Sequence, residues 1–372
     1  MNAPDFRLAA SAVRTDREWL EPHWMPYCAN RAFKADPHLF VAGEGAWLTT
    51  HDGRRLYDSL SGLWCTGLGH CRTEISAAIA RQASTLDFSP AFQYGHPLSF
   101  ELANRIVEHM PEGLNRVFFT NSGSEAADTS LKMARAYWRL KGQAGKTRLV
   151  GRIRGYHGVG FGGISVGGLV SNRKLFGQTL EADHLPHTQP PNGSFCRGMP
   201  EEGAHLADEL LQLIALHDAS NIAAVIVEPF AGSFMSAPGP NYVAEFTHGY
   251  TYSAHPIACA AGLAAIDLLE QDNAIERVQE LAPYFEAAVH TLKGAKHVGD
   301  VRNFGLAAGI TLLPAPGEPA KRPYQAAMAM YDKGFYLRNA GDCVALAPPF
   351  ISTRAEIDSV VNALGEVLST ID

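Results

Sequence analysis

Apolar and polar residues alternate along this chain in blocks that predict a protein of alternating strands and helices. Short, continuous apolar runs predict buried strands at residues 117–119, 148–151 and 223–227. Elsewhere apolar residues recur every three or four positions, as on one face of a helix, which predicts helices at residues 74–86, 97–110, 201–217 and 257–270. Fully apolar strands separated by helices are typical of a mostly parallel α/β sheet.

The two ends of the chain have a different pattern. Residues 40–57 predict a hairpin, because two apolar stretches flank a glycine-rich turn. Residues 273–372 predict an α+β unit of the size of a small domain. Its expected elements are a helix at 275–292, a strand around 305–313, a helix at 324–333, extended segments at 334–338 and 344–348, and a helix at 354–368. We therefore expect a large domain at residues 61–272 and a small domain formed by residues 1–60 with 273–372.

The turn at residues 121–124 is the strongest candidate for a binding site. It lies between the apolar run 117–119 and a helix with Leu131 and Trp138 on its apolar face. Ser122 or Ser124 can cap this helix, and free N–H groups at a helix start bind anions, typically phosphate. A capped turn without a ligand would give the same pattern. Tyr156, His157 and Glu228 also follow apolar strands, and ligands of parallel sheets bind beyond the strand carboxyl ends, which favours the binding site.

Composition and charge exclude several function classes. The chain has 372 residues, of which 46% are hydrophobic and 19% charged, and its net charge is −7. It has no Lys/Arg cluster that would indicate a nucleic-acid partner, no apolar run of membrane-spanning length and no signal peptide. Its six cysteines have no framework spacing, which indicates reduced thiols in a cytoplasmic protein. Its fifteen histidines form no ligand pair, so no metal site is expected.

Three short motifs match catalytic patterns without the context that those patterns need. Residues 158–163 satisfy G-x-G-x-x-G, but they follow a loop and no helix is expected to open after them, so we interpret the match as chance. Ser165 lies in a G-x-S-x-G match, which leaves a serine hydrolase as a weak alternative because the motif needs a strand before it. Ser171 and Lys174 satisfy S-x-x-K with no companion motif.

The longer blocks of sequence resemble the class III aminotransferases, which are fold type I enzymes dependent on pyridoxal 5′-phosphate (PLP). Within that family the chain most resembles the ω-amino acid:pyruvate (β-alanine:pyruvate) transaminases. The resemblance runs from about residue 20 to the C-terminus. The blocks that carry it are residues 23–31, 60–70, 85–100, 118–139, 155–158, 217–233 and 248–263.

The resemblance implies a role for each candidate residue. Ser122, Gly123 and Ser124 would bind the PLP phosphate, Tyr156 would stack on the pyridine ring with His157 beside it, and Glu228 would lie near the ring substituents. Thr251 would reach the phosphate bound by the neighbouring subunit of a homodimer or homotetramer. Trp64 would line the substrate pocket, although it also fits a packing role. Arg338 would bind the substrate carboxylate, although an exposed surface arginine fits equally.

Two residues that the family needs are missing from this sequence. A lysine must bind PLP as a Schiff base and move the proton, and an acid must keep the pyridine nitrogen protonated. In the family both follow apolar strands that come after the equivalent of residues 225–229. None of the nine lysines here follows such a strand, and no apolar strand ends in aspartate. We expect a deletion of several dozen residues between Ser233 and Phe234, within an irregular segment at 231–246.

Such a deletion would affect both folding and chemistry. It would remove about three strands of the large domain's sheet, so strand 223–227 would lack a neighbour and expose apolar side chains. We therefore expect a weakly folded or aggregating chain that has no catalytic lysine and whose transamination is lost or impaired. A non-catalytic binder of PLP or another phosphate ligand is the second hypothesis. The small-molecule partners implied by the resemblance are pyruvate and an amino donor, for which β-alanine, another ω-amino acid or an amine all fit.

Overall fold

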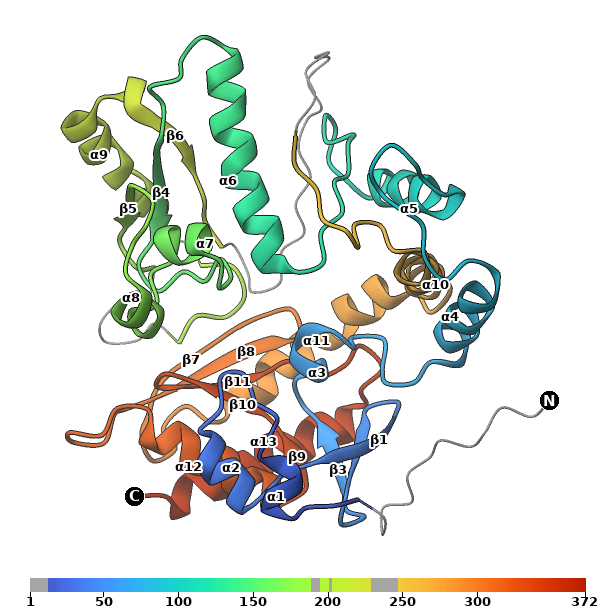
Figure 1. Ribbon diagram of the computed structural model, residues 1–372. Helices are drawn as coiled ribbons and strands as arrows, with labels where there is room; N and C mark the ends of the chain where they lie inside the picture. The colour runs from blue at the N-terminus through green and yellow to red at the C-terminus, as the bar shows by residue number, and fades with distance from the viewer. Residues whose placement is uncertain (1–12, 189–194, 201–202, 229–246) are drawn as a thin grey trace. The chain divides into compact units, whose positions relative to one another are not determined.

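The computed structural model describes residues 13–188, 195–200, 203–228 and 247–372 (Figure 1). The chain divides into two compact units. The first unit contains residues 1–73, 192–199 and 268–372, and the second contains residues 74–191 and 200–267. None of the described helices is both long enough and apolar enough to cross a membrane.

The helices and strands of the first unit come from both ends of the chain. Their bounds are α1 (Arg17–Leu20), α2 (Asn30–Ala35), β1 (Phe40–Glu44), β2 (Trp47–Thr50), β3 (Arg55–Asp58), α3 (Ser61–Trp64), α11 (Ala274–His290), β7 (Val298–Phe304), β8 (Ala307–Leu312), α12 (Lys321–Asp332), β9 (Phe335–Tyr336), β10 (Arg338–Ala340), β11 (Cys343–Leu346) and α13 (Arg354–Thr370). The strands form two sheets, with orders β1-β2-β3-β9 and β10-β11-β8-β7. Helices α11, α12 and α13 pack with the second sheet around a core that includes Phe285, Ile310, Met330 and Leu364.

The second unit is built on a short parallel sheet. Its elements are α4 (Thr73–Thr85, whose first residue belongs to the first unit), α5 (Pro97–Glu108), α6 (Gly123–Leu140), β4 (Arg148–Arg152), α7 (Phe161–Val166), α8 (Val170–Phe176), β5 (Ala182–Leu185), a 3-10 turn (Ala204–Ala207), α9 (Glu209–His217), a 3-10 turn (Ala219–Asn221), β6 (Ile222–Val225) and α10 (Pro256–Gln271, which continues into the first unit). The sheet order is β5-β4-β6, and both pairings are parallel. Helix α6 packs against β6 and α9 against β5 (Figure 1). The parallel sheet confirms the expected fold class.

Strand β6 is an edge of this sheet in the part of the chain that the structure describes, because it pairs only with β4. Val225 and Val227 are 42% and 45% exposed. The predicted strand at residues 117–119 is absent: the described backbone there is not in a sheet, and Phe118 stacks on His248 with ring centroids 5.9 Å apart. A strand forms only beside a partner, so an apolar run without a described neighbour stays outside the sheet.

The glycine-rich stretch after β4 was wrongly predicted to contain no helix. Helix α7 opens at Phe161, inside the G-x-G-x-x-G match. The glycines allow close backbone packing: a Cβ at Gly151 would lie 1.8 Å from the Val166 carbonyl oxygen, and one at Gly163 would lie 2.1 Å from that of His157. Gly151 therefore lets α7 pack onto β4, and the glycines of the motif let it pack onto the loop that follows β4.

Most helices whose bounds were predicted are confirmed within two residues at each end, namely α4, α5, α10, α11 and α13, and the helix expected after residue 124 is α6. The helix predicted at 201–217 is shorter, because regular α-helix begins only at Glu209. Helix α8 and strands β5 and β7 were not predicted. The irregular segment predicted at 231–246 lies outside the described residues.

Helix α3 is a turn of left-handed backbone. Ser61, Gly62, Leu63 and Trp64 have φ angles of 48°, 55°, 63° and 68°. Only glycine adopts this region freely, and other L-residues lose roughly 1–2 kcal/mol each there. Three strained residues within four positions require strong local support from the surrounding structure.

Candidate functional site

Two side-chain hydrogen bonds cap the turn before α6. The Ser122 Oγ accepts a hydrogen bond from the Glu125 N–H at 3.2 Å, and the Glu125 carboxylate accepts one from the Asn121 N–H at 2.7 Å. Ser122 is thus the N-cap, one of the two residues predicted for that role. The cap fixes the first turn of an eighteen-residue helix, whose opening N–H groups have no partner within the helix itself.

Ser124 joins this turn to the loop that follows β4. Its Oγ accepts a hydrogen bond from the Val159 N–H at 3.0 Å. A Cβ on Gly158 would lie 2.5 Å from the Ser124 Cα, so only glycine permits this approach. In contrast, a Cβ on Gly123 would meet nothing within 4 Å. The helix start is therefore braced on one side and open at Gly123, as an anion site requires.

Glu228 lies beside the same loop. Its carboxylate accepts a hydrogen bond from the Tyr156 N–H at 2.9 Å. Burial raises the pKa of Glu228, and the hydrogen bond from Tyr156 opposes that shift. The Tyr156 ring itself is 45% exposed. The structure thus brings Tyr156 and Glu228 into direct contact, with a flat aromatic face accessible beside a carboxyl group.

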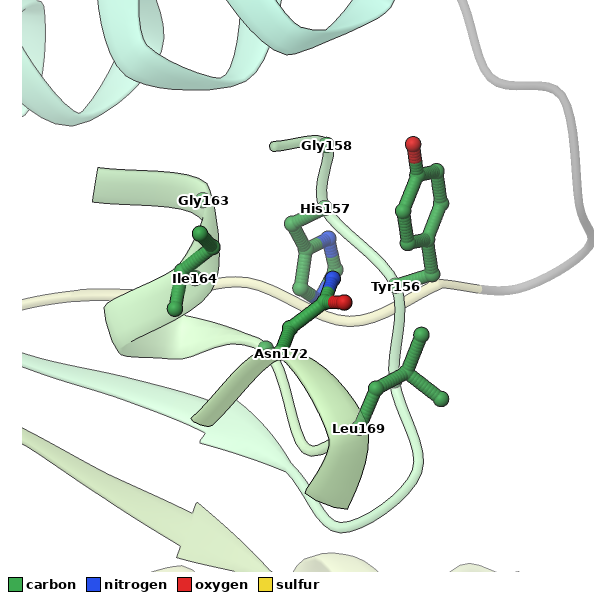
Figure 2. Close-up of a pocket in the computed structure, with 9 residues that line it drawn as sticks. Tyr156, His157, Gly158, Gly163, Ile164, Leu169 and Asn172 are labelled. Atoms are coloured by element: carbon green, nitrogen blue, oxygen red, sulfur yellow. The ribbon is translucent and has the colours of Figure 1, made fainter. Parts of the chain in front are cut away.

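His157 contributes a half-buried imidazole to a small pocket. Figure 2 shows Tyr156 and His157 on one loop, around a pocket whose wall also includes Ile164, Leu169 and Asn172. Burial lowers the pKa of His157, and the nearby His184 lowers it further. The His157 Nε2 is buried and has no hydrogen-bond partner among the residues that the structure describes. The ring is therefore a neutral polar group at neutral pH.

Replacing Glu228 by glutamine is expected to stabilise the protein at neutral pH. Because folding raises the pKa of Glu228, the folded carboxyl group binds its proton more tightly than the unfolded one. The contribution of Glu228 to the free energy of unfolding is then greatest below pH 4.5, the ordinary pKa of a glutamate side chain. It falls as the pH rises through the raised pKa of the folded state. A glutamine oxygen can still accept from the Tyr156 N–H. Thermal unfolding should place Glu228→Gln above the wild type at pH 7 and level with it near pH 4, whereas Glu181→Gln, which changes an exposed carboxylate, should show no such gain.

Asp128 was not predicted but organises the same region. Its carboxylate accepts a hydrogen bond from the Gly163 N–H at 2.7 Å, and a Cβ at Gly160 would lie 2.3 Å from the Asp128 Oδ2. This contact fixes α7 against α6. The sequence signal for this contact was the spacing of the glycines at residues 158–163. The close approach of the Asp128 carboxylate explains these glycines better than a bound dinucleotide would.

Thr251 lies in a turn near the middle of α6. It is exposed, and its neighbours His248 and Tyr250 both hydrogen-bond the buried Thr129 hydroxyl, at 2.9 Å and 3.1 Å. These bonds fix the segment that carries Thr251 to the helix of the capped turn. The second unit therefore holds every cofactor-binding candidate: Ser122, Gly123, Ser124, Tyr156, His157, Glu228 and Thr251.

The two substrate-binding candidates belong to the first unit. Trp64 ends the left-handed turn and is 38% exposed, which is more than a core tryptophan would be. Arg338 is exposed at the start of β10. Tyr336 is two residues before Arg338 and pairs with Asp58 across β9 and β3. The pKa of Tyr336 is raised by burial and by Asp58, and Arg338 opposes that shift. The structure thus gathers these residues within one unit.

Comparison with known proteins identifies the family. The model of the family described as "Aminotransferase class-III" matches residues 30–245 and 234–368. The chain is 48% identical to the omega-amino acid–pyruvate aminotransferase of Pseudomonas putida, over 95% of this chain and 96% of the relative. It is equally similar to the beta-alanine–pyruvate aminotransferase of Pseudomonas aeruginosa. The chain belongs to the class III aminotransferases.

Solved structures of transaminases share the fold. An amine transaminase from an uncultivated Pseudomonas species, solved with PLP bound, has 27% identity, a TM-score of 0.83 and coverage of 93% of this chain and 98% of that one. An omega-transaminase from Thermomicrobium roseum has 25% identity, a TM-score of 0.84 and coverage of 95% and 97%. The fold is therefore that of the fold type I transaminases, for which PLP is the cofactor.

The alignments place a gap inside this class III chain. The alignment with the Pseudomonas putida relative is 432 positions long, whereas the whole chain has 372 residues, so at least 60 positions have no counterpart here. The two matches to the family model overlap at residues 234–245. That is the place where the sequence predicts the deletion, between Ser233 and Phe234.

All nine lysines lie in the described part of the chain, four of them in the second unit. Lys146 donates to the Ala219 carbonyl, ahead of β6, and Lys141 lies at the far end of α6 from the capped turn. Lys132 and Lys174 are exposed on α6 and α8. None of the four follows the carboxyl end of a described strand, where the family places its covalent lysine.

The residues therefore fit PLP only in part. The open, capped start of α6 suits a phosphate, and the accessible Tyr156 ring suits an aromatic ring. Among the described residues of the second unit, no lysine follows the carboxyl end of a strand. Asp183, the one aspartate within a strand of this sheet, is held by Arg148 at 3.0 Å and His217 at 3.1 Å.

Proposed function

We propose that this chain derives from transaminases that move an amino group from an ω-amino acid of the β-alanine type to pyruvate. We further propose that it binds PLP without a covalent bond and that its own transamination is lost or severely impaired. The observation that carries the proposal is the capped, open start of α6 in a unit whose four lysines do not follow the carboxyl end of a described strand. The relatives named for omega-amino acid or beta-alanine and pyruvate support the substrate class.

Each candidate residue has a physical task in this proposal. The N–H groups at Gly123 and Ser124 hold the phosphate, and the Ser124 hydroxyl donates to it while accepting from Val159. Tyr156 orients the aromatic ring, and Glu228 keeps the Tyr156 backbone in place. When bound, PLP supplies an electron sink for carbanion chemistry. In this chain no residue is assigned to move the proton on which that chemistry depends.

Trp64 and Arg338 are assigned to substrate binding. The Arg338 guanidinium would bind the carboxylate of an amino acid or keto acid, and Trp64 would form an apolar wall. A homodimer or homotetramer, with Thr251 reaching the phosphate bound by the neighbouring subunit, belongs to the same proposal. So does a cytoplasmic location, which the six free cysteines support.

Replacing Ser124 by alanine is expected to weaken PLP binding about tenfold or more, since a hydrogen bond to a charged group contributes about 1.5–3 kcal/mol. The matched control is Ser130→Ala, on the same helix, whose hydroxyl donates to the Ala127 carbonyl at 2.6 Å. Equilibrium dialysis with PLP measures both. Equal affinity of the two variants, or no retention of PLP by the wild type, would remove the phosphate site from the proposal.

The serine hydrolase alternative is not supported by the position of Ser165. This residue is fully buried within α7. Its hydroxyl donates to the Phe161 carbonyl at 2.7 Å and accepts from the backbone N–H groups of Thr179 and Leu180. A nucleophilic serine is presented at a sharp strand-to-helix turn instead. Ser165 therefore has a structural role, which anchors the segment between α8 and β5.

A further inference from the structure

The left-handed turn α3 needs an explanation, because it places Trp64 at the end of four successive residues with positive φ. Two backbone bonds close the turn, from Trp64 N–H to the Leu60 carbonyl at 3.1 Å and from Cys65 N–H to the Ser61 carbonyl at 2.8 Å. A right-handed turn could make bonds of the same kind without strain. Additional contacts must therefore select the left-handed form.

Asp58 provides such contacts at the start of the turn. Its side chain is completely buried, and its two oxygens accept hydrogen bonds from the Leu60 N–H at 3.0 Å and the Gly62 N–H at 2.7 Å. A buried carboxylate that is bonded to two turn amides fixes the backbone between them. The side chain thus defines the direction in which the chain enters α3.

His70 fixes Asp58 in turn. The His70 Nε2 donates to the same carboxylate at 2.7 Å. Its backbone is bonded in both directions to Gly45, with N···O distances of 2.7 Å and 3.1 Å, and a Cβ on Gly43 would lie only 3.0 Å from the His70 Cβ. The hairpin β1–β2 therefore anchors His70, and His70 anchors the carboxylate that holds the turn.

We propose that Asp58 and His70 are positioning residues that fix the indole of Trp64 by clamping the left-handed turn. The consequence for the substrate site rests on the proposed function, in which Trp64 is the apolar wall of the pocket. A fixed wall sets the length and width of the amino donor that fits beside Arg338. Asp58 and His70 would thus determine donor specificity without touching the donor.

Fluorine NMR of the chain labelled with 5-fluorotryptophan tests the clamp directly. The protein has five tryptophans, and Trp64→Phe assigns the resonance of Trp64. In His70→Leu, the Trp64 signal is expected to shift or broaden while the other four stay in place. His70→Gln should restore it, since the glutamine amide can donate where Nε2 does. His290→Leu is the matched control, a buried histidine of the same unit bonded to Asn303 at 3.0 Å.

Asp58→Asn provides a second variant, because the amide keeps the side-chain volume but loses one acceptor. A Trp64 signal that is unchanged in both His70→Leu and Asp58→Asn overturns the proposal. Collapse of all five signals in both variants also overturns it, since the pair would then support the whole unit. The experiment needs neither PLP nor turnover, so its outcome is independent of whether the chain binds PLP or transaminates.

Discussion

With PLP, β-alanine and pyruvate, the purified chain is expected to form alanine more than about 10⁴-fold more slowly than its Pseudomonas putida relative. Proton transfer by a positioned side chain contributes about 10²–10⁴-fold by itself, and the missing lysine also removes covalent catalysis. Within the second unit, the described lysines are exposed or at the far ends of α6 and β6. A coupled assay for alanine measures the rate. Turnover within tenfold of the relative would contradict the proposed loss.

Borohydride reduction separates a chemical defect from a binding defect. The reagent fixes PLP to any lysine that holds it covalently, and peptide mapping then locates the label. We expect the wild type to retain PLP on dialysis but to show no site-specific label after reduction. One lysine labelled in full would show that a residue of this chain replaces the family lysine.

Insertion of the relative's segment between Ser233 and Phe234 tests the proposed loss by a gain of function. At least 60 alignment positions have no counterpart in this chain, and the sequence predicts that they fall at this junction. It is expected to restore both the specific label and at least about 10²-fold of the rate. A Gly/Ser-rich insert of equal length is the control, since it adds a flexible connection without strands or a lysine.

The capped start of α6 was predictable from sequence because its signals are local. A serine three residues before a glutamate, followed by a periodic apolar run, specifies a capped helix start. This signal does not depend on what the helix later packs against. Tyr156 and Glu228 were also predictable, since each follows a strand of a parallel sheet. Their mutual hydrogen bond was not, because it joins residues 72 positions apart in the sequence.

The errors arise where local pattern and tertiary context disagree. Residues 117–119 have the composition of a strand, yet strand formation depends on a neighbour that the described chain does not supply. Helix α7 was missed because its glycines lower helix propensity, while their close packing against the His157 carbonyl and Asp128 compensates. No periodic pattern in the sequence predicts the contact between Asp58 and His70. Only the fold brings these two side chains together.

The second unit is expected to unfold before the first and to self-associate through β6. Its main described core contains five buried apolar side chains, whereas that of the first unit contains twenty-four. Buried apolar area is the main source of stability, and net stabilities are only about 5–15 kcal/mol. Hydrogen exchange should therefore show lower protection in β4 and β6 than in β8 and β11. Equal protection in the two units would contradict this expectation.

Val225→Lys tests the route of self-association. Val225 is the last residue of β6, pairs with Val150 of β4 and is 42% exposed, so a lysine there places charge on an open strand edge. Such charges oppose edge-to-edge pairing, and we expect about twofold or more soluble protein after centrifugation. The control is Val170→Lys, which adds the same charge to an exposed valine of α8. If both variants improve solubility equally, net charge is the cause; if only Val225→Lys does, the chain associates through the strand that its missing segment would have covered.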